Sequence, residues 1–414
     1  MGSSVTSNAW RSVDRSSDVI IGNRLSRAVQ WRGRLALVTI GLLLPVLLLE
    51  AVLRVFGPVL PGEYQLGSWL VPDPRYGHFH ARGVGVWLRT SEFVTYVRTN
   101  QSGLRGEEVP STRAPGEGRI LALGDSFVEA RQVREPETAT SLIERALNRG
   151  PQSSCRVLNG GVAGWGTGEE YVYLQQEGLA LRPDLVIIFF YVGNDVANNL
   201  RRPSGQAPQH RGPPFRVDSQ GRLQELPFEP PEQPSAPLAV LRGYSRAFNL
   251  LESGVLSKLF DREDDERERP DAGKLDLFSV RETSERRQAW QVTEALLAAI
   301  RDQTRASGAE LGLVAIPASY QVYSREWARI VPRARGADTW QPDVPNRRLA
   351  EVVAGLGIPY LDLLPAFRAA SGLEAERLYF PINAHWTPSG NRLAADQVVQ
   401  FLAAHPELLP AGCR

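Results

Sequence analysis

Apolar and polar positions alternate along most of the chain in blocks that predict strands followed by helices. Apolar runs of strand length recur, and each ends in glycine or polar residues: 119–126, 155–161, 183–195, 311–318 and 358–364. Helix-like stretches, several of which stop at glycine, follow these runs: 137–150, 169–181, 286–308, 346–357 and 390–405. Strands that alternate with helices predict an α/β domain built on a parallel sheet.

A much longer apolar run lies near the N-terminus. Leu35 to Leu49 carries no charge, and the run continues to Phe56. About 22 residues give roughly 33 Å of helix, which is enough to cross a bilayer core. We therefore expect a transmembrane anchor at 34–56, with Glu50 and Arg54 placed to pair on one helical face.

The charges around this run predict its orientation. Arginines dominate the preceding residues: Arg11, Arg15, Arg24, Arg27, Arg32 and Arg34, against Asp14 and Asp18. The positive-inside rule then places a cytoplasmic tail at 1–33 and the rest of the chain outside the cytoplasm, which predicts a single-pass protein of the inner membrane. A cleaved signal peptide is the alternative, but the polar lead-in is long and no small-x-small site follows.

The chain after the anchor divides into a connector and a domain. Residues 57–117 have the Pro/Gly punctuation of an irregular connector with some strand, and 118–410 carry the α/β pattern. The alternation stops at about 201–283, which we interpret as an insertion that includes a surface helix. In the connector, His78 and His80 share one face if extended. That arrangement would suit a metal, but without a third ligand nearby a surface or packing pair is favoured.

Composition narrows the classes of function. The chain has 414 residues, of which 43% are hydrophobic and 22% charged, and the net charge is +1. This is globular composition with no excess of positive charge for nucleic acid. The two cysteines, Cys155 and Cys413, exclude a cysteine-rich zinc site. Outside the cytosol they could form one bridge or remain separate thiols.

Polar residues gather where the predicted strands end, which is where ligands bind in parallel α/β sheets. Ser126 follows the first strand in "LGDSF", Gly164 the second in "GGVAGWG", and Asn194 the third in "YVGND"; His385 lies in the loop before the last helix. A serine hydroxyl becomes a nucleophile when a base such as histidine takes its proton. The Ser126 N–H, the Gly164 N–H and the Asn194 amide could bind the oxyanion of acyl transfer.

These residues, in this order, resemble the SGNH (GDSL-type) hydrolase family. "GDSF", "VAGWG", "GND" and "NAHWTPSG" match its four blocks, and the resemblance covers about 119–200 and 286–405. It implies a flavodoxin-like three-layer α/β/α sandwich with a parallel sheet. It also implies that Ser126 and His385 act as nucleophile and base on acyl esters. "HWTPSG" resembles the alginate O-acetyltransferase-like branch, in which the acyl group is often acetyl.

One position departs from the family pattern. Family members usually carry an aspartate two or three residues before the histidine, where this chain has Asn383 and Ile382. Such an acid fixes the tautomer of the base and stabilises its charged form. Three hypotheses remain open: Asn383 orients His385 through its carbonyl oxygen, a different acid such as Asp362 does so, or the site does not turn over.

The sequence therefore supports two functions. The first is a membrane-anchored, extracytoplasmic esterase or O-acyltransferase whose substrate is an acyl ester, of a cell-envelope polysaccharide or of a small molecule. The second is a catalytically weak or inactive protein that binds an envelope glycan or a protein partner. No nucleic acid is expected, and the absence of a P-loop, a G-x-G-x-x-G motif and a cysteine cluster predicts no cofactor or metal.

Overall fold

The computed structural model describes residues 16–56, 64–66, 69–110, 112–150, 153–199, 212–228, 232, 234–251, 276–331, 339–372 and 377–414. Their contacts divide the chain into two compact units, Met1–Gly57 and Pro58–Arg414. The segment expected to be a connector thus belongs, from residue 58 onward, to the same compact unit as the α/β domain.

The first unit is one long helix. Helix α1 runs from Ser16 to Phe56 and contains Pro45. Within it, Trp31–Phe56 has a mean hydropathy of 2.5 and is long and apolar enough to cross a membrane. Arg54 Nε donates to Glu50 Oε1 at 2.8 Å, which confirms the expected pair. A helix of this kind is compatible with a single-pass anchor and with a signal sequence.

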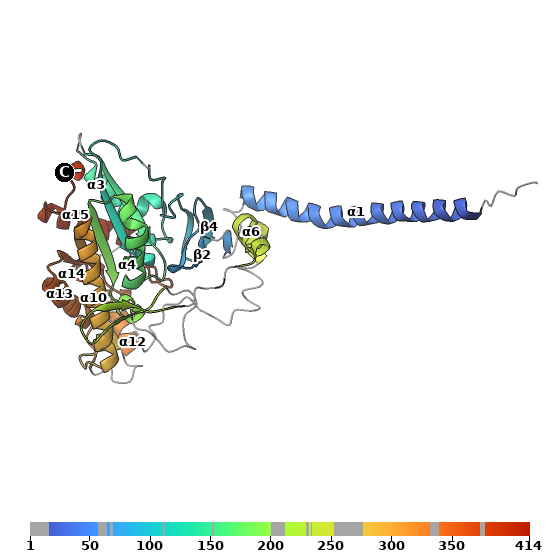
Figure 1. Cartoon of the computed structure of the whole chain (residues 1–414). Coiled ribbons are helices and arrows are strands. Elements are labelled where there is room, and N and C mark those ends of the chain that lie inside the picture. The colour runs from blue at the N-terminus through green and yellow to red at the C-terminus, as the bar shows by residue number, and fades with distance from the viewer. Residues whose placement is uncertain are drawn as a thin grey trace, which may run out of the picture. The chain divides into compact units, whose positions relative to one another are not determined.

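The second unit is built on a parallel sheet (Figure 1). Its five strands have the spatial order β12-β11-β8-β6-β7. Their bounds are β6 (Gly118–Gly124), β7 (Cys155–Gly161), β8 (Leu185–Tyr191), β11 (Glu310–Ile316) and β12 (Tyr360–Asp362). From the edge strand β7 the chain order is 2-1-3-4-5, the flavodoxin-like order, whose switch point lies between the first and third strands. The predicted flavodoxin-like fold is therefore confirmed.

Helices cover both faces of this sheet because its crossovers are right-handed. The face that a crossover helix covers then depends on whether the chain moves one way or the other along the sheet to its next strand. The chain steps from β6 to β7 in one direction and from β7 through β8 and β11 to β12 in the other. Accordingly, α4 and α13 both pack against α10, whereas α3 and α14 both pack against α15. The bounds are α3 (Ala139–Leu147), α4 (Thr167–Gln176), α10 (Ser284–Ala306), α13 (Val344–Leu356), α14 (Leu364–Ser371) and α15 (Pro388–Ala404).

The central strand explains the apolar run at 185–191. Every residue of β8 is buried, because β6 and β11 flank its edges and helices cover both faces. A strand buried on both sides shows a continuous apolar run and no alternation. Burial of these side chains supplies much of the hydrophobic free energy that holds the site's scaffold rigid.

The segment before the sheet is more regular than predicted. Strands β1, β4 and β5 form an antiparallel sheet, and β2 pairs with β3. Their bounds are β1 (Tyr64–Leu66), β2 (Leu70–Asp73), β3 (Gly77–His80), β4 (Gly85–Arg89) and β5 (Val94–Arg98). In β5, exposed and buried residues alternate, as the sequence "EFVTYVRT" predicts.

The insertion at 201–283 is described in part. It contains the hairpin of β9 (Phe215–Val217) and β10 (Leu223–Glu225). The expected surface helix is two shorter ones in the described part, α6 (Ala236–Tyr244) and α7 (Arg246–Leu251). Within the insertion, residues 201–211, 229–231, 233 and 252–275 lie outside the described residues.

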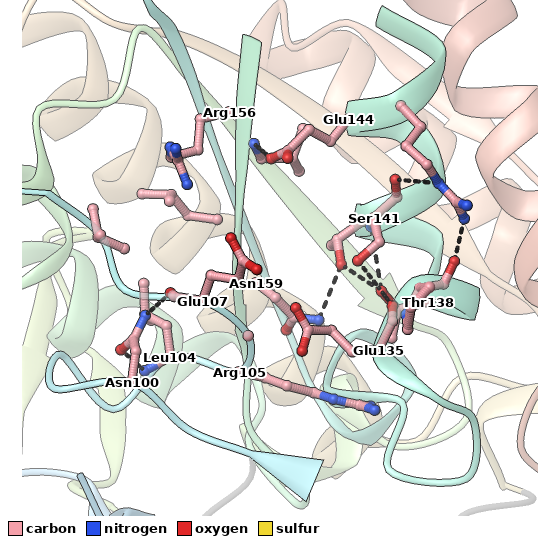
Figure 2. A pocket seen from close by; sticks show the side chains of 17 residues that line it. Asn100, Leu104, Arg105, Glu107, Glu135, Thr138, Ser141, Glu144, Arg156 and Asn159 are labelled. Carbon is pink, nitrogen blue, oxygen red and sulfur yellow. Dashed lines mark hydrogen bonds between the residues drawn. The ribbon is translucent and has the colours of Figure 1, made fainter. Parts of the chain in front are cut away.

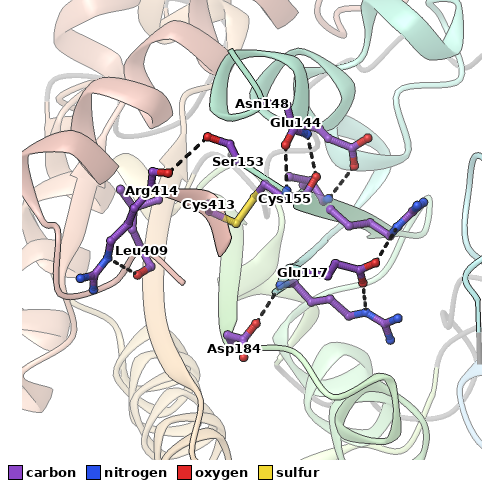
Figure 3. Close-up of a disulfide and its surroundings, with 12 residues drawn as sticks. Glu117, Glu144, Asn148, Ser153, Cys155, Asp184, Leu409, Cys413 and Arg414 are labelled. Carbon is purple, nitrogen blue, oxygen red and sulfur yellow. Dashed lines mark hydrogen bonds and ion pairs between the residues drawn. A yellow bond between two sulfur atoms is a disulfide. The ribbon is translucent and has the colours of Figure 1, made fainter. Parts of the chain in front are cut away.

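A disulfide joins Cys155, at the start of β7, to Cys413, in the short 3-10 helix η8 (Ala411–Cys413) (Figure 3). The open question about the two cysteines is thus answered in favour of a bridge. Backbone contacts support the same junction: the Ser154 N–H donates to the Gly412 carbonyl at 2.7 Å. The bridge fastens the C-terminus to the amino ends of the strands, opposite the edge where the strands end in polar residues.

Candidate active site

Ser126 is positioned by the turn that follows β6. Asp125 caps the short helix α2 (Ser126–Glu129), and its Oδ1 accepts from the Phe127 N–H at 2.9 Å. An aspartate at an N-cap satisfies an otherwise unpaired helix N–H, so "GDSF" has a local structural reason as well as a chemical one. Among residues 121–130, Ser126 alone is more than marginally exposed. The strand and cap thus present one hydroxyl at the carboxyl edge of the sheet.

His385 reaches this hydroxyl from the far end of the chain. Its Nε2 lies 2.7 Å from Ser126 Oγ. The ring packs on Phe127, with ring centroids 4.7 Å apart, and is half-buried. A nucleophile and a base within hydrogen-bond reach are the first requirement of covalent acyl transfer.

Hydrogen bonds to Gly124 and Asp125 hold the loops that carry Gly164 and Asn194 close to Ser126. The Val162 N–H donates to the Gly124 carbonyl at 3.0 Å and anchors the loop that carries Gly164. Asn194 Nδ2 donates to Asp125 Oδ2 at 3.3 Å. Gly164 has φ +83°, a left-handed conformation that favours glycine and turns the loop's main chain. The structure therefore brings together the loops that carry Ser126, Gly164, Asn194 and His385.

Asn194 has donor capacity to spare. An amide nitrogen carries two hydrogens, and the bond to Asp125 uses one of them. This bond holds the amide against the residue that precedes Ser126, and the oxyanion role expected of Asn194 stays a prediction.

Two buried acids lie next to these donors. Burial, together with the charge of Asp125, raises the pKa of Glu170 well above its usual range. Burial and the neighbouring Glu170 likewise raise the pKa of Asp195, which follows Asn194 in the chain. Burial thus disfavours the charged form of both acids beside these donors.

The ring of His385 is oriented by main chain. Its Nδ1 lies 2.8 Å from the main-chain carbonyl oxygen of Asn383. The side-chain Oδ1 of Asn383 is buried and has no hydrogen-bond partner among the described residues. The carbonyl that holds the ring is thus the backbone carbonyl. It accepts a hydrogen bond from Nδ1–H, and in the neutral ring this leaves Nε2 unprotonated toward Ser126.

Asp362 is engaged elsewhere. Its Oδ1 accepts from Asn346 Nδ2 at 2.8 Å and from the Leu364 N–H at 2.9 Å, at the point where β12 leads into α14. Burial raises the pKa of this carboxyl. These contacts give Asp362 a structural task in capping α14, and no described bond joins it to His385.

The two histidines of β3 contact the segments that carry Gly164 and Ser126. His78 Nε2 lies 2.7 Å from the Ala163 carbonyl, in the residue before Gly164. His80 Nε2 lies 2.8 Å from Glu129 Oε1, at the end of the nucleophile's helix, and its Nδ1 lies 2.8 Å from the Gly103 carbonyl. Both are buried, and the described residues contain no cluster able to hold a metal ion. The packing interpretation of this pair agrees with these contacts.

The buried Glu129 carboxylate, at the end of α2, is hydrogen-bonded by two side chains of the N-terminal segment. Burial alone would raise its pKa, but the hydrogen bond and charge of His80 outweigh burial and lower the pKa to about 2. Trp69 Nε1 also donates to Glu129 Oε1, at 3.0 Å. The sequence offered no signal for Glu129, since its partners lie 49 and 60 positions away.

One cavity of the described residues lies elsewhere (Figure 2). It holds about 280 Å³ between β7, α3 and the loop before β6, and mixed charges line it, including Arg105, Glu135, Glu144 and Arg156. Neither Ser126 nor His385 lines it. The chemistry of the polar strand ends therefore identifies the candidate site.

Comparisons with known proteins agree with this geometry. Residues 277–412 match the family model described as SGNH hydrolase-like domain, acetyltransferase AlgX. The matched region contains Asn383 and His385, whereas Ser126 precedes it. A search of curated protein sequences found no match.

Solved structures similar to this chain include two ester hydrolases. One is a lipase/acylhydrolase from Enterococcus faecalis, with 14% identity, a TM-score of 0.37, and coverage of 71% of this chain and 98% of that one. Another is a catalytic mutant of an acetylxylan esterase from Geobacillus stearothermophilus, with 12% identity, a TM-score of 0.36, and coverage of 69% and 94%. At these TM-scores the two structures carry no argument about the function of this chain. The family model, the strand order and the four motifs thus agree on an SGNH hydrolase-like domain, whose residues 277–412 are similar to the AlgX acetyltransferase model.

Proposed function

We propose that this protein is a serine esterase or O-acyltransferase that uses Ser126 and His385 on acyl esters, with acetyl as the expected group. The observation that carries the proposal is the 2.7 Å contact between His385 Nε2 and Ser126 Oγ at the carboxyl edge of the sheet. The oxyanion donors expected from the sequence are carried by the adjacent loops. The AlgX-type match at 277–412 favours acetyl transfer over other acyl chemistry.

The geometry supports a two-step reaction. Ser126 Oγ attacks the acyl carbonyl carbon while His385 Nε2 takes the hydroxyl proton. The oxyanion is stabilised by the N–H groups of Ser126 and Gly164 and by the Asn194 amide. The ester's alcohol then leaves with the proton from His385, and the acyl group remains on Ser126. Water or an acceptor hydroxyl gives its proton to His385 and attacks the acyl carbon. The bond from that carbon to Ser126 Oγ then breaks, and His385 returns the proton to Oγ, which restores both residues.

Hydrolysis and transfer differ only in the second acceptor. We propose a glycan of the cell envelope as the natural acceptor or ester. Support comes from the candidate membrane span Trp31–Phe56, from the arginine-rich residues before it, and from the Cys155–Cys413 disulfide, which suits an oxidising compartment. On this proposal the catalytic domain lies outside the cytoplasm, anchored by one helix.

A fluorophosphonate probe tests the first part. Full-length protein in lipid nanodiscs is expected to be labelled on Ser126, as read by mass spectrometry of the peptide. Ser126→Ala and His385→Ala are expected to lose the label, the second because an unactivated serine reacts slowly. Equal labelling of wild type and Ser126→Ala would reject the nucleophile. No labelling of folded wild type would favour a binding protein that retains the fold.

A competition experiment separates transfer from hydrolysis. With p-nitrophenyl acetate as donor and an oligosaccharide as acceptor, a transferase forms acetylated oligosaccharide in excess over free acetate. A hydrolase releases acetate whatever the acceptor concentration. Ser126→Ala is the control for uncatalysed acetylation.

A further inference from the structure

The loop that carries His385 is a tight turn with one strained residue. The Phe380 N–H donates to the His385 carbonyl at 2.8 Å, and the Ala384 N–H donates to the Phe380 carbonyl at 3.0 Å. Ala384 has φ +59°, in the left-handed region that non-glycine residues adopt only when their surroundings hold them there. This conformation lies between Asn383, whose carbonyl meets the imidazole, and His385 itself.

A carboxylate from a distant segment holds this turn. Glu92 Oε1 accepts from the Ile382 N–H at 2.8 Å, and Glu92 Oε2 accepts from the Asn383 N–H at 2.7 Å. The residues are 290 and 291 positions apart in the chain. Two N–H groups that converge on one carboxylate form short, charge-assisted bonds, which are stronger and more directional than neutral ones.

The segment that carries Glu92 is itself well fixed. It is the turn between β4 and β5, where the Thr90 N–H donates to the Phe93 carbonyl at 2.9 Å. Thr90 Oγ1 accepts from the Glu92 and Phe93 N–H groups, both at 3.2 Å. The Phe93 ring packs on Phe380, with centroids 5.5 Å apart. The carboxylate is thus presented by a closed turn that also contacts the histidine loop through apolar side chains.

One residue of main chain connects this carboxylate to the base. The N–H of Asn383 is bound to Glu92, and the carbonyl of the same residue is bound to His385 Nδ1. We propose that Glu92 is a positioning residue for His385, which supplies through the backbone of Asn383 the orientation and negative charge that the side chain at position 383 does not. This inference rests on the proposed ester chemistry.

The proposal predicts a specific kinetic loss. Glu92→Gln keeps the length of the side chain but places an NH₂ group against one of the two N–H donors and removes the charge. We expect kcat to fall roughly ten- to hundredfold, the range of one charge-assisted hydrogen bond, with KM within about threefold. The loss is smaller than that from removing a triad acid because the carboxylate acts through the main chain and is half-buried.

A double-mutant cycle with Asn383→Asp separates positioning from mere folding of the loop. The Asn383→Asp variant would have a carboxylate next to the imidazole, so Glu92 would be redundant there and its charge would repel the new one. We expect Glu92→Gln to cost less than about threefold in the Asn383→Asp background, or to increase kcat. A loop that merely needs Glu92 to fold would lose the same factor in both backgrounds.

The matched control is Glu108→Gln. Both carboxylate oxygens of Glu108 accept from the Gln101 N–H, at 3.1 and 3.0 Å, in the same N-terminal segment but away from His385. Its kcat is expected to equal that of wild type. All variants are assayed as full-length protein in nanodiscs with p-nitrophenyl acetate, and their thermal unfolding is compared.

The outcomes distinguish this inference from the proposed function. If wild type shows Ser126-dependent turnover and Glu92→Gln matches it, the positioning role is rejected while the esterase proposal stands. Equal losses in both backgrounds also reject it. If wild type shows no Ser126-dependent turnover, both proposals fall together. A large loss in the native background that Asn383→Asp abolishes supports the inference.

Discussion

Removing the amide of Asn194 is the change whose effect the structure defines most closely. One amide hydrogen is bound to Asp125 Oδ2 at 3.3 Å, and the proposed mechanism assigns the other to the oxyanion. Asn194→Ala therefore deletes one of three expected donors. Loss of one such donor costs about 10²–10³ in kcat, or about 3–4 kcal/mol of transition-state stabilisation. Asp125 also loses a partner, which costs stability on the order of 1–2 kcal/mol.

The assay is p-nitrophenyl acetate hydrolysis together with urea unfolding of the same preparation. We expect kcat to fall at least 10²-fold with little change in KM, because the donor acts mainly on the transition state. Asn346→Ala is the control: this buried amide holds Asp362 at the end of the edge strand β12. It is expected to lower stability and leave kcat nearly intact. A folded Asn194→Ala variant with kcat within threefold of wild type would refute the assigned oxyanion hole.

Two further predictions concern stability. Cys413→Ser opens a crosslink with a sequence separation of 258, for which loop entropy gives roughly 5 kcal/mol and measured losses typically reach about 2–5 kcal/mol. The free energy of unfolding in urea should fall by about 2–5 kcal/mol. The value of kcat should be retained, because the bridge lies at the opposite end of the strands from Ser126. A large loss of kcat without unfolding would contradict this. The carboxylate of Glu129 has a pKa of about 2, below its usual value of 4.5. Above pH 4.5 this difference adds on the order of 3 kcal/mol to the free energy of unfolding, and the contribution is lost as the pH falls through 2. Glu129→Gln should therefore flatten the unfolding free energy between pH 4.5 and 2, and an unchanged acid dependence would argue against the His80–Glu129 pair.

The sheet and its polar edge could be predicted because their signals are local. The unbroken apolar run of β8 marks a strand buried on both faces, and the block "GDSF" marks a strand end, a cap and a hydroxyl at once. Four such blocks in order were enough to predict which strand ends meet. The switch point between β6 and β8 then follows from the chain order.

What the sequence could not reveal depends on contacts between distant segments. Glu92 meets the histidine loop across 290 positions, and His80 meets Glu129 across 49, and periodicity contains no information about such pairs. The orienter of His385 is a backbone carbonyl, which every residue possesses, so no residue type marks it. For the same reason the pattern of 57–117 predicts only an irregular connector with some strand. Val86, Leu88 and Val97 of its short strands form a small apolar cluster with Trp69, and no local pattern shows that these positions meet.

The central claim is that Ser126 and His385 form a working nucleophile and base without an aspartate at position 383. Turnover of p-nitrophenyl acetate by full-length protein, compared among wild type, Ser126→Ala and His385→Ala, tests it most directly. We expect measurable turnover by wild type and a loss of at least about 10³-fold in both variants. Turnover that is equal in wild type and Ser126→Ala, or absent from a folded wild type, would contradict it.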